Sequence, residues 1–295
     1  MMAIKRNILL LGMLLTTAVL MAQEVDAEAV RPVTNVLQLQ MGRVSARDTY
    51  LTPQLYSGIN MGVQYERWHA WKNPLWVSEQ TVVARFGMPE DRGGHSSEWV
   101  GRFGYRYAAH HRWEHVLWEP LTLLGGAFAG VEGGFDYNLK MEGANNPATV
   151  KMAVNTGVSA AAIWYYKLFG KPCSAMLHMQ LPLIGLALQP EYGASYYETF
   201  YLKTAGNETH FTSLHNRQDL DVRLTTDMAL SAIPWLKNNG NRLRLGVGYH
   251  IETMDINQVV TRYSTCECIV GVVFDAMKYN RQKTNLLKRQ AYEAY

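Results

Sequence analysis

The amino-acid sequence predicts an all-β protein: a transmembrane antiparallel β-barrel of about ten strands. Three observations predict this fold. Apolar and polar residues alternate along many stretches, and aromatic residues cluster beside several expected turns. After the N-terminal region, no stretch approaches the roughly 18 consecutive apolar residues of a membrane-spanning helix. Alternation with a period of two is typical of strands, and a chain without an apolar helix can cross a membrane only as a closed barrel.

The N-terminus has the pattern of a secretory signal peptide. Lys5 and Arg6 precede an apolar run over residues 8–20, and the small residue Ala22 follows. The run is short for a membrane span, which favours a cleaved signal peptide, residues 1–22, over a retained anchor helix. We therefore expect export, with cleavage after Ala22 and delivery to the outer membrane of a Gram-negative bacterium.

The mature chain is expected to form one barrel domain, residues 23–274, followed by a basic C-terminal tail, residues 275–295. No linker or low-complexity tract divides it. Cleavage of residues 1–22 removes two basic residues, so 28 − 2 = 26 basic residues face 25 acidic ones and the net charge is +1. A nearly neutral chain gives no reason to expect nucleic acid as a partner. Three cysteines are too few for a disulfide framework.

The first four strands are predicted where aliphatic or aromatic residues alternate with polar ones. In the first of them, Leu37, Leu39 and Met41 share one parity, whereas Gln38 and Gln40 share the other. The same pattern places the strands at 37–43, 59–68, 82–87 and 99–107.

Six further strands follow. Glycine and alanine weaken the alternation in 121–133 and 150–166. In 173–185, Pro182 cannot donate a backbone hydrogen bond, so we expect a bulge there. The segment 108–120 is long for a turn, and a further hairpin within it would give twelve strands. Charged residues occupy one parity of the last three strands, at 220–232, 241–253 and 262–274.

The connections should differ between the two ends of the barrel, because outer-membrane barrels have short periplasmic turns and longer outer loops. Tryptophans such as Trp68, Trp71, Trp76 and Trp113 flank the compact inner turns, as expected of an aromatic girdle. A soluble β-sandwich, in which these residues fill a core, is the alternative. If the first strand starts in the periplasm, the outer connections are 44–58, 88–98, 134–149, 186–219 and 254–261.

The chain resembles a known family. The segments "LTPQLYSGINMGVQYERW", "QLPLIGLALQPEYGASYYETF", "SLHNRQDLDVRLTTDMAL" and "NRLRLGVGYHIETMDIN" are similar to those of a domain-of-unknown-function family (3316 type) of exported proteins from gut Gram-negative bacteria. The resemblance extends over most of the mature chain. It implies secretion and a barrel-like outer-membrane fold, and it assigns no catalytic residue.

Charged residues on the inward parity are expected to form a network inside the barrel. Arginine facing lipid at the midplane would cost roughly 2–4 kcal/mol, so these residues should point to the lumen. About ten strands leave little room beyond side chains, which favours a narrow pore or a closed barrel over a wide porin. The predicted network comprises Arg102, Arg106, His178, Asp221, Arg223, Asp227, Arg242, Arg244, His250 and Glu252.

The long connection around residues 189–221 is the candidate binding segment, since long loops on rigid scaffolds often bind ligands. Expected partners are outer-membrane lipid and either a small solute or a surface glycan, with the protein a monomer. No metal, cofactor or catalytic motif is predicted, and the role expected is a narrow solute pore or a surface-binding envelope protein. The alternative is a hydrolase of lipid or lipopolysaccharide that uses a rim histidine, His250 or His215. The candidate binding residues are Tyr192, Tyr196, Tyr197, Phe200, Tyr201 and His215.

Overall fold

A computed structural model describes most of the chain from residue 33 to residue 275. The predicted signal peptide and nearly all of the predicted tail lie outside the described residues, as do parts of several connections. The described ranges are 33–73, 75–114, 120–140, 147–168, 170–193, 201–202, 208–230 and 241–275.

Within these ranges the chain forms eleven β-strands and no helix long and apolar enough to cross a membrane. The strands of the barrel wall are 13 to 21 residues long, longer than the roughly 9–11 residues that span a bilayer. The strands are β1 (Val33–Asp48), β2 (Thr52–Ala70), β3 (Trp76–Asp91), β4 (Glu98–Glu114), β5 (Leu121–Asn138), β6 (Ala148–Leu168), β7 (Lys171–Leu188), β8 (Thr209–Ser213), β9 (Arg217–Ala229), β10 (Arg242–Ile256) and β11 (Val259–Asp275).

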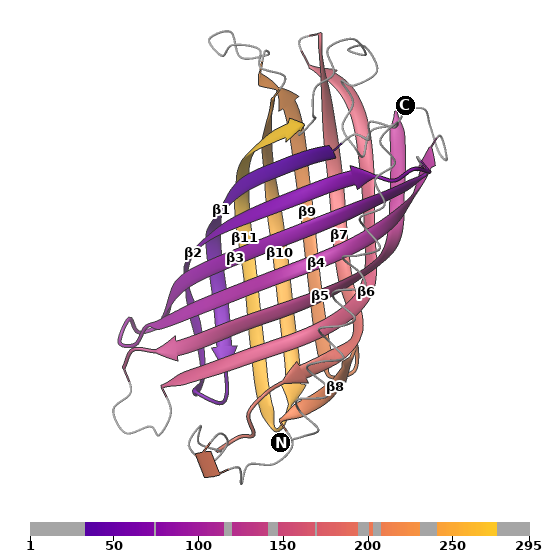
Figure 1. The fold of residues 1–295 in the computed structure, drawn as a ribbon. Helices are drawn as coiled ribbons and strands as arrows, with labels where there is room; N and C mark the ends of the chain where they lie inside the picture. Colours follow the sequence, from indigo (N-terminus) through magenta and orange to yellow (C-terminus); the bar gives the residue numbers. More distant parts are fainter. Residues whose placement is uncertain are drawn as a thin grey trace. The chain divides into compact units, whose positions relative to one another are not determined.

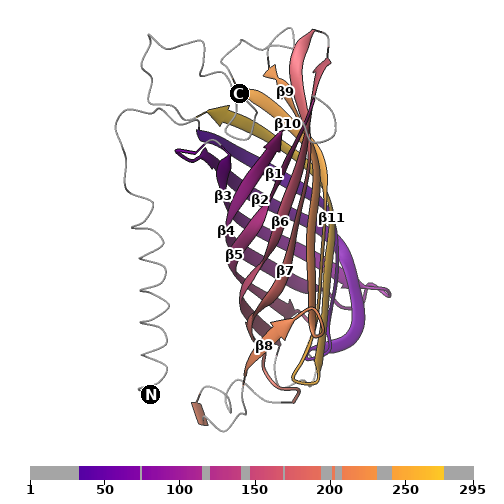
Figure 2. The same cartoon turned by 90° about the vertical axis from the view of Figure 1, so that its right-hand side faces the viewer.

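Ten of these strands close into an antiparallel barrel. Sequence neighbours pair from β1 to β7, β9 pairs with β7 and β10, and the wall closes where β1 pairs with β11. The strands run steeply tilted around the wall (Figure 1), and the view turned by 90° shows the sheet curving round on itself (Figure 2). Each strand predicted from the alternation corresponds to one strand of this wall, although 220–232 runs past Ala229 at the end of β9 and 241–253 begins one residue before Arg242 of β10. The ten-stranded barrel is confirmed.

The structure excludes the alternative of twelve strands, which would have needed a further hairpin in 108–120. β4 continues to Glu114, which pairs with Thr122 of β5, so the two strands are direct neighbours up to the connection between them. Polar residues such as His110 and Arg112 interrupt the apolar signal here, but their side chains point into the barrel and the strand continues.

The bulge predicted at Pro182 is present in β7. Gly157 of β6 pairs with Pro182 and Thr156 pairs with Ile184, which leaves Leu183 as the extra residue. Beyond the bulge, β7 changes partner: its first half pairs with β9, and its last residues pair with the short strand β8. β8 therefore extends the wall past the end of β9.

The strands extend much further into the predicted outer connections than expected. β1 and β2 leave only residues 49–51 between them, and β10 and β11 are joined through Asn257 and Gln258. Both residues have positive φ, 55° and 61°, as a type I′ hairpin requires. The expected long loops at 44–58 and 254–261 are therefore mostly strand. The apolar alternation fades there because the strand leaves the apolar belt, while pairing continues.

Apolar side chains cover the outside of the barrel, and polar side chains fill its inside. Leu39, Met41 and Met61 are about 60% exposed on the outer face, at 65%, 59% and 60%, whereas Arg244 is fully buried inside. This distribution is the reverse of that in a soluble protein, in which large apolar residues are most often buried and charged residues are mostly exposed.

The two ends of the barrel are called inner and outer here after the predicted orientation. The inner end holds the turn at 71–75, and the outer end holds the turn at 49–51. Near the inner end, the rings of Trp71 and Trp76 stack on the outer face with centroids 5.9 Å apart, as expected of a girdle. Trp68, expected in this girdle, instead points into the barrel and is fully buried.

Candidate functional site

The interior of the barrel is filled by side chains, and an apolar cluster lies near its inner end. Trp68 of β2 is its largest member, and the same cluster includes Leu124 of β5 and Ile163 of β6. A second apolar cluster, which includes Met254 and Ile256, lies near the outer end. Much of the polar network lies between these two clusters, and further charges lie beside the second one.

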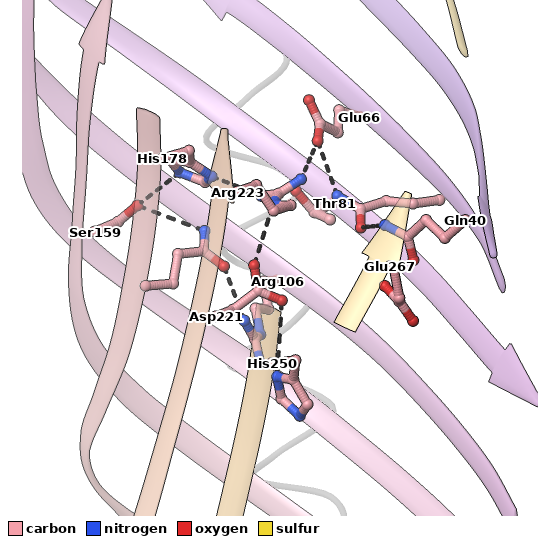
Figure 3. A network of polar contacts seen from close by, with 12 residues as sticks. Gln40, Glu66, Thr81, Arg106, Ser159, His178, Asp221, Arg223, His250 and Glu267 are labelled. Carbon is pink, nitrogen blue, oxygen red and sulfur yellow. Dashed lines mark hydrogen bonds and ion pairs between the residues drawn. The ribbon is translucent and has the colours of Figure 1, made fainter. Parts of the chain in front are cut away.

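Glu66 on β2 forms the centre of the next layer. Its carboxylate accepts hydrogen bonds from Arg223 of β9 and from Arg244 of β10, the latter at 2.9 Å. Arg244 also binds Asp227 through two hydrogen bonds of 2.7 and 2.8 Å. Figure 3 shows how this network reaches across the barrel from Glu66 through Arg223 to His178 and Asp221. Bidentate pairs of this kind are strong and fix the geometry of both partners.

Glu79, His110 and His178 meet beside this layer, and each offers a ligand-type atom within 4.8 Å of the others. Arg223 donates a hydrogen bond of 2.6 Å to His178 Nδ1. Because arginine only donates, the neutral His178 ring carries its proton on Nε2, the atom that faces Glu79 at 3.2 Å. A protonated nitrogen cannot ligate a metal, so the residues present do not fit a metal centre.

Ser159 lies in the same cluster, 2.8 Å from His110 Nε2 and 3.2 Å from His178 Nε2. A serine between two imidazoles has the residue types of a nucleophile and its base. However, Ser159, His110 and His178 are all at most 2% exposed, and Trp68 stacks on the His110 ring. The cluster thus has the groups of a hydrolase without access for a substrate.

Three arginines form ion pairs in the middle of the barrel. Arg85 donates to Glu267 at 3.1 Å, and Arg106 donates to Glu132 at 2.9 Å. Arg217 joins Glu132 at 2.6 Å and also approaches other carboxylates. Between these pairs lies a cavity of about 50 Å³, with room for a few water molecules. Its polar lining consists of Arg85, Arg102, Arg106, Glu132, Lys151, Arg217, His250 and Glu252.

A further group of charges lies at the outer end of the lumen. Lys151 bridges Asp48 and Asp136 at 2.9 and 2.5 Å. Arg102 also binds Asp136, at 2.6 Å. Sequence reasoning missed several of these partners because it placed them in loops. Extending the alternation of the predicted strands in both directions would have identified Asp48, Asp136, Arg217 and His110 as inward-facing residues.

The structure places all ten residues of the predicted charge network on the inward side of the wall. Arg242 is the one at the inner rim, where it is partly exposed. His250, predicted as a rim histidine, is instead buried within the barrel together with Asp221, and its Nδ1 lies 3.7 Å from Asp221 Oδ2. β8 and the long outer parts of the strands raise the rim above them.

The predicted binding residues are described only in part. Tyr196, Tyr197 and Phe200 lie outside the described residues, whereas Tyr192 and Tyr201 are exposed. His215 lies in an exposed turn with its Nδ1 2.5 Å from Ser213 Oγ. In the described part of the chain, no carboxylate lies within ion-pair distance of His215 to orient it.

The closed wall, apolar outer face and charged interior define a ten-stranded antiparallel β-barrel of the kind that spans membranes by strands. The chain belongs to the family described as "Protein of unknown function (DUF3316)", whose model matches residues 7–283. No curated protein matches the chain.

Solved barrels resemble the chain only weakly. The translocator domain of the autotransporter NalP from Neisseria meningitidis is 8% identical, with 92% of this chain and 97% of that chain covered and a TM-score of 0.40. The outer membrane protease OmpT from Escherichia coli is 5% identical, with 86% and 99% covered and a TM-score of 0.46. The COG4313 outer membrane channel from Pseudomonas putida F1 is 9% identical, with 86% and 98% covered and a TM-score of 0.33. These similarities carry no argument about function.

Proposed function

We propose that this protein is an outer-membrane β-barrel with a closed lumen, and that it acts as a surface-binding or structural envelope protein rather than as a solute pore. The outer face supports the membrane location. Leu37, Leu39 and Met41 on β1, with Val270 and Val272 on β11, present a continuous apolar surface to the surroundings. In water this surface would be a large exposed apolar patch, whereas lipid satisfies it.

One observation supports the proposal that the lumen is closed. Ion pairs cross the interior of the barrel and join strands that are not neighbours in the wall. Glu66 on β2 binds Arg223 on β9 and Arg244 on β10, and Arg85 on β3 binds Glu267 on β11. All five side chains are buried. Separating such a pair leaves buried charges without partners, at about 3–5 kcal/mol for each broken pair. A solute would have to break several pairs to pass.

The apolar layer at the inner end supports the same conclusion. Part of the lumen that would need a polar lining in a pore is filled by Trp68, Leu124 and Ile163. All three side chains are at most 2% exposed. A solute that passed the charged layers would next meet this apolar layer. The binding or structural work of the protein therefore falls to its outer surface and its rim.

Single-channel recording in planar bilayers tests the proposal. We expect the folded wild-type protein to insert without conductance steps. Trp68→Gly, which removes the largest side chain of the inner layer, should increase the ionic conductance of the bilayer. Trp76→Gly, an outward-facing tryptophan near the same turn, is the matched control and should leave the bilayer silent. Wild-type conductance steps that respond to Arg244→Glu would show that the protein is a pore and overturn the proposal.

A further inference from the structure

Three arginines stand on the outer face of the barrel, close to its outer end. Arg43 and Arg47 lie on β1, and Arg262 lies on β11. Arg43 and Arg47 share the parity of the exposed Leu37, Leu39 and Met41 on β1, and Arg262 shares that of the exposed Val270 and Val272 on β11, so the three side chains point away from the lumen. Arg43 and Arg262 are exposed and Arg47 is partly exposed. We call this group, together with the serines described below, the arginine patch.

The pairing of β1 with β11 brings two of these charges together. Arg47 and Arg262 are directly opposite each other in the register. Side chains directly opposite in an antiparallel pair have Cβ atoms about 4.5–5.5 Å apart, and like charges in this position are destabilising. A sheet that tolerates such a pair needs an anion, or well-ordered water, between the two guanidinium groups.

Neither arginine finds that anion among the described residues. Arg43, Arg47 and Arg262 form no ion pair with any carboxylate in the described part of the chain, and Arg47 Nε is buried without a hydrogen-bond acceptor. Glu90 of β3 and Asp255 of β10 are the nearest acidic residues on this face by register, and they lie beyond ion-pair distance. This contrasts with the interior, where Glu267, Asp136, Glu132 and Asp227 are each paired with an arginine.

Hydroxyl groups lie beside the arginines. Ser45 lies between Arg43 and Arg47 on the same face of β1, and it is directly opposite both Ser57 of β2 and Ser264 of β11. Guanidinium and hydroxyl groups together are the donors that bind phosphate oxygens, and arginine can do so through two parallel hydrogen bonds.

The position of the patch indicates what its anion belongs to. On β1 it lies between the exposed apolar residues, which end at Met41, and the outer turn at 49–51. This is where the acyl chains of a lipid would end and its headgroup begin. An even number of strands puts both ends of the wall at the inner end, so the patch faces the leaflet on the opposite side.

We infer that the arginine patch binds the phosphate groups of a phosphorylated lipid in the outer leaflet. The site rests on the proposed membrane location. The lipid phosphate lies between Arg47 and Arg262, Arg43 and the serines bind the remaining headgroup oxygens, and the acyl chains lie along the apolar face of β1 and β11. The lipid thereby supplies the acceptor that the protein lacks.

Native mass spectrometry of the detergent-solubilised barrel tests this site. The probes are bisphosphorylated lipid A, dephosphorylated lipid A and inorganic phosphate. We expect the wild-type protein to retain bisphosphorylated lipid A, and Arg47→Gln with Arg262→Gln to weaken its binding about tenfold or more. Arg67→Gln removes an exposed arginine of β2 near the inner end and is the matched control, with binding unchanged. Heat-modifiable gel migration verifies that each variant is folded.

The other outcomes overturn the inference in distinguishable ways. Equal binding of dephosphorylated lipid A, or unchanged binding by the double variant, shows that the patch does not recognise lipid phosphate. Binding of inorganic phosphate as tight as that of the lipid assigns the patch to free phosphate instead. A wild-type protein that inserts into vesicles but ignores lipid A refutes this site alone, whereas a protein that stays soluble without detergent refutes the proposed membrane location and the site with it.

Discussion

Arg244 on β10 donates a hydrogen bond of 2.9 Å to Glu66 on β2, although 178 residues separate them in the sequence. Their strands are not neighbours, because β11 and β1 lie between them in the sheet. The pair therefore crosses the lumen and does not join neighbouring strands of the wall. Both side chains are at most 1% exposed, so neither charge has water as an alternative partner.

Replacing Arg244 should destabilise the barrel severely. Arg244→Leu leaves Asp227 without its bidentate partner and removes one of the two arginines that pair with Glu66. We expect a loss of about 3–5 kcal/mol in the free energy of unfolding, measured by urea titration in detergent micelles. Arg67→Leu, which removes an exposed arginine, should change it by less than about 0.5 kcal/mol.

A compensating variant separates this explanation from a simple packing defect. Adding Glu66→Gln and Asp227→Asn to Arg244→Leu removes the stranded charges and should recover most of the lost stability. If the triple variant is no more stable than Arg244→Leu, buried charge is not the cause of the defect.

Glycine is required where two strands approach closely at Gly42. A Cβ at this position would overlap the carbonyl oxygen of Cys266 on β11. Gly42→Ala should therefore force β1 and β11 apart at the seam that closes the barrel, and lower stability by about 1–3 kcal/mol. At Gly133, a Cβ would lie 3.7 Å from its nearest neighbour, the carbonyl oxygen of Lys151. Urea midpoints of Gly42→Ala and Gly133→Ala compare the two sites, and equal midpoints would contradict the close approach.

The buried serine should not react as a nucleophile. Ser159 lies within hydrogen-bond distance of two histidines but is only 2% exposed. We expect a fluorophosphonate probe to leave it unmodified in the folded protein, as read by peptide mass spectrometry.

The lipid composition of cells that carry His250→Ala or His215→Ala should likewise match that of the wild type. Modification of Ser159, or a change in lipid composition with either variant, would favour the hydrolase.

Sequence reasoning predicted the strands and the inward parity because both depend on a local period of two. Arg102, Arg106 and Arg244 were identified as lumen residues from their neighbours alone. The outer halves of the strands escaped this reasoning, since Asp48 and Asp136 lie where the outward face is no longer continuously apolar. The inward position of Trp68 was not predicted either, because an aromatic residue near a turn can belong to an interfacial girdle or fill the lumen.

The partners across the lumen could not be predicted. Whether Glu66 meets Arg223 and Arg244 depends on the closure of the barrel and on the tilt of its strands, which place β2 opposite β9 and β10. The same holds for the cluster of Glu79, His110, Ser159 and His178, whose members come from β3, β4, β6 and β7. The arginine patch likewise depends on the register that puts Arg47 opposite Arg262.

The orientation of the two faces is the central claim, and the native cysteines give its most direct measurement. Cys268 points outward beside exposed Val270, whereas Cys173 is buried. In a Cys173→Ser, Cys266→Ser protein reconstituted into lipid vesicles, Cys268 should react with a lipid-soluble maleimide and resist a charged, water-soluble one. Rapid labelling by the charged reagent in the folded protein would contradict the account, because it would place the apolar face in water.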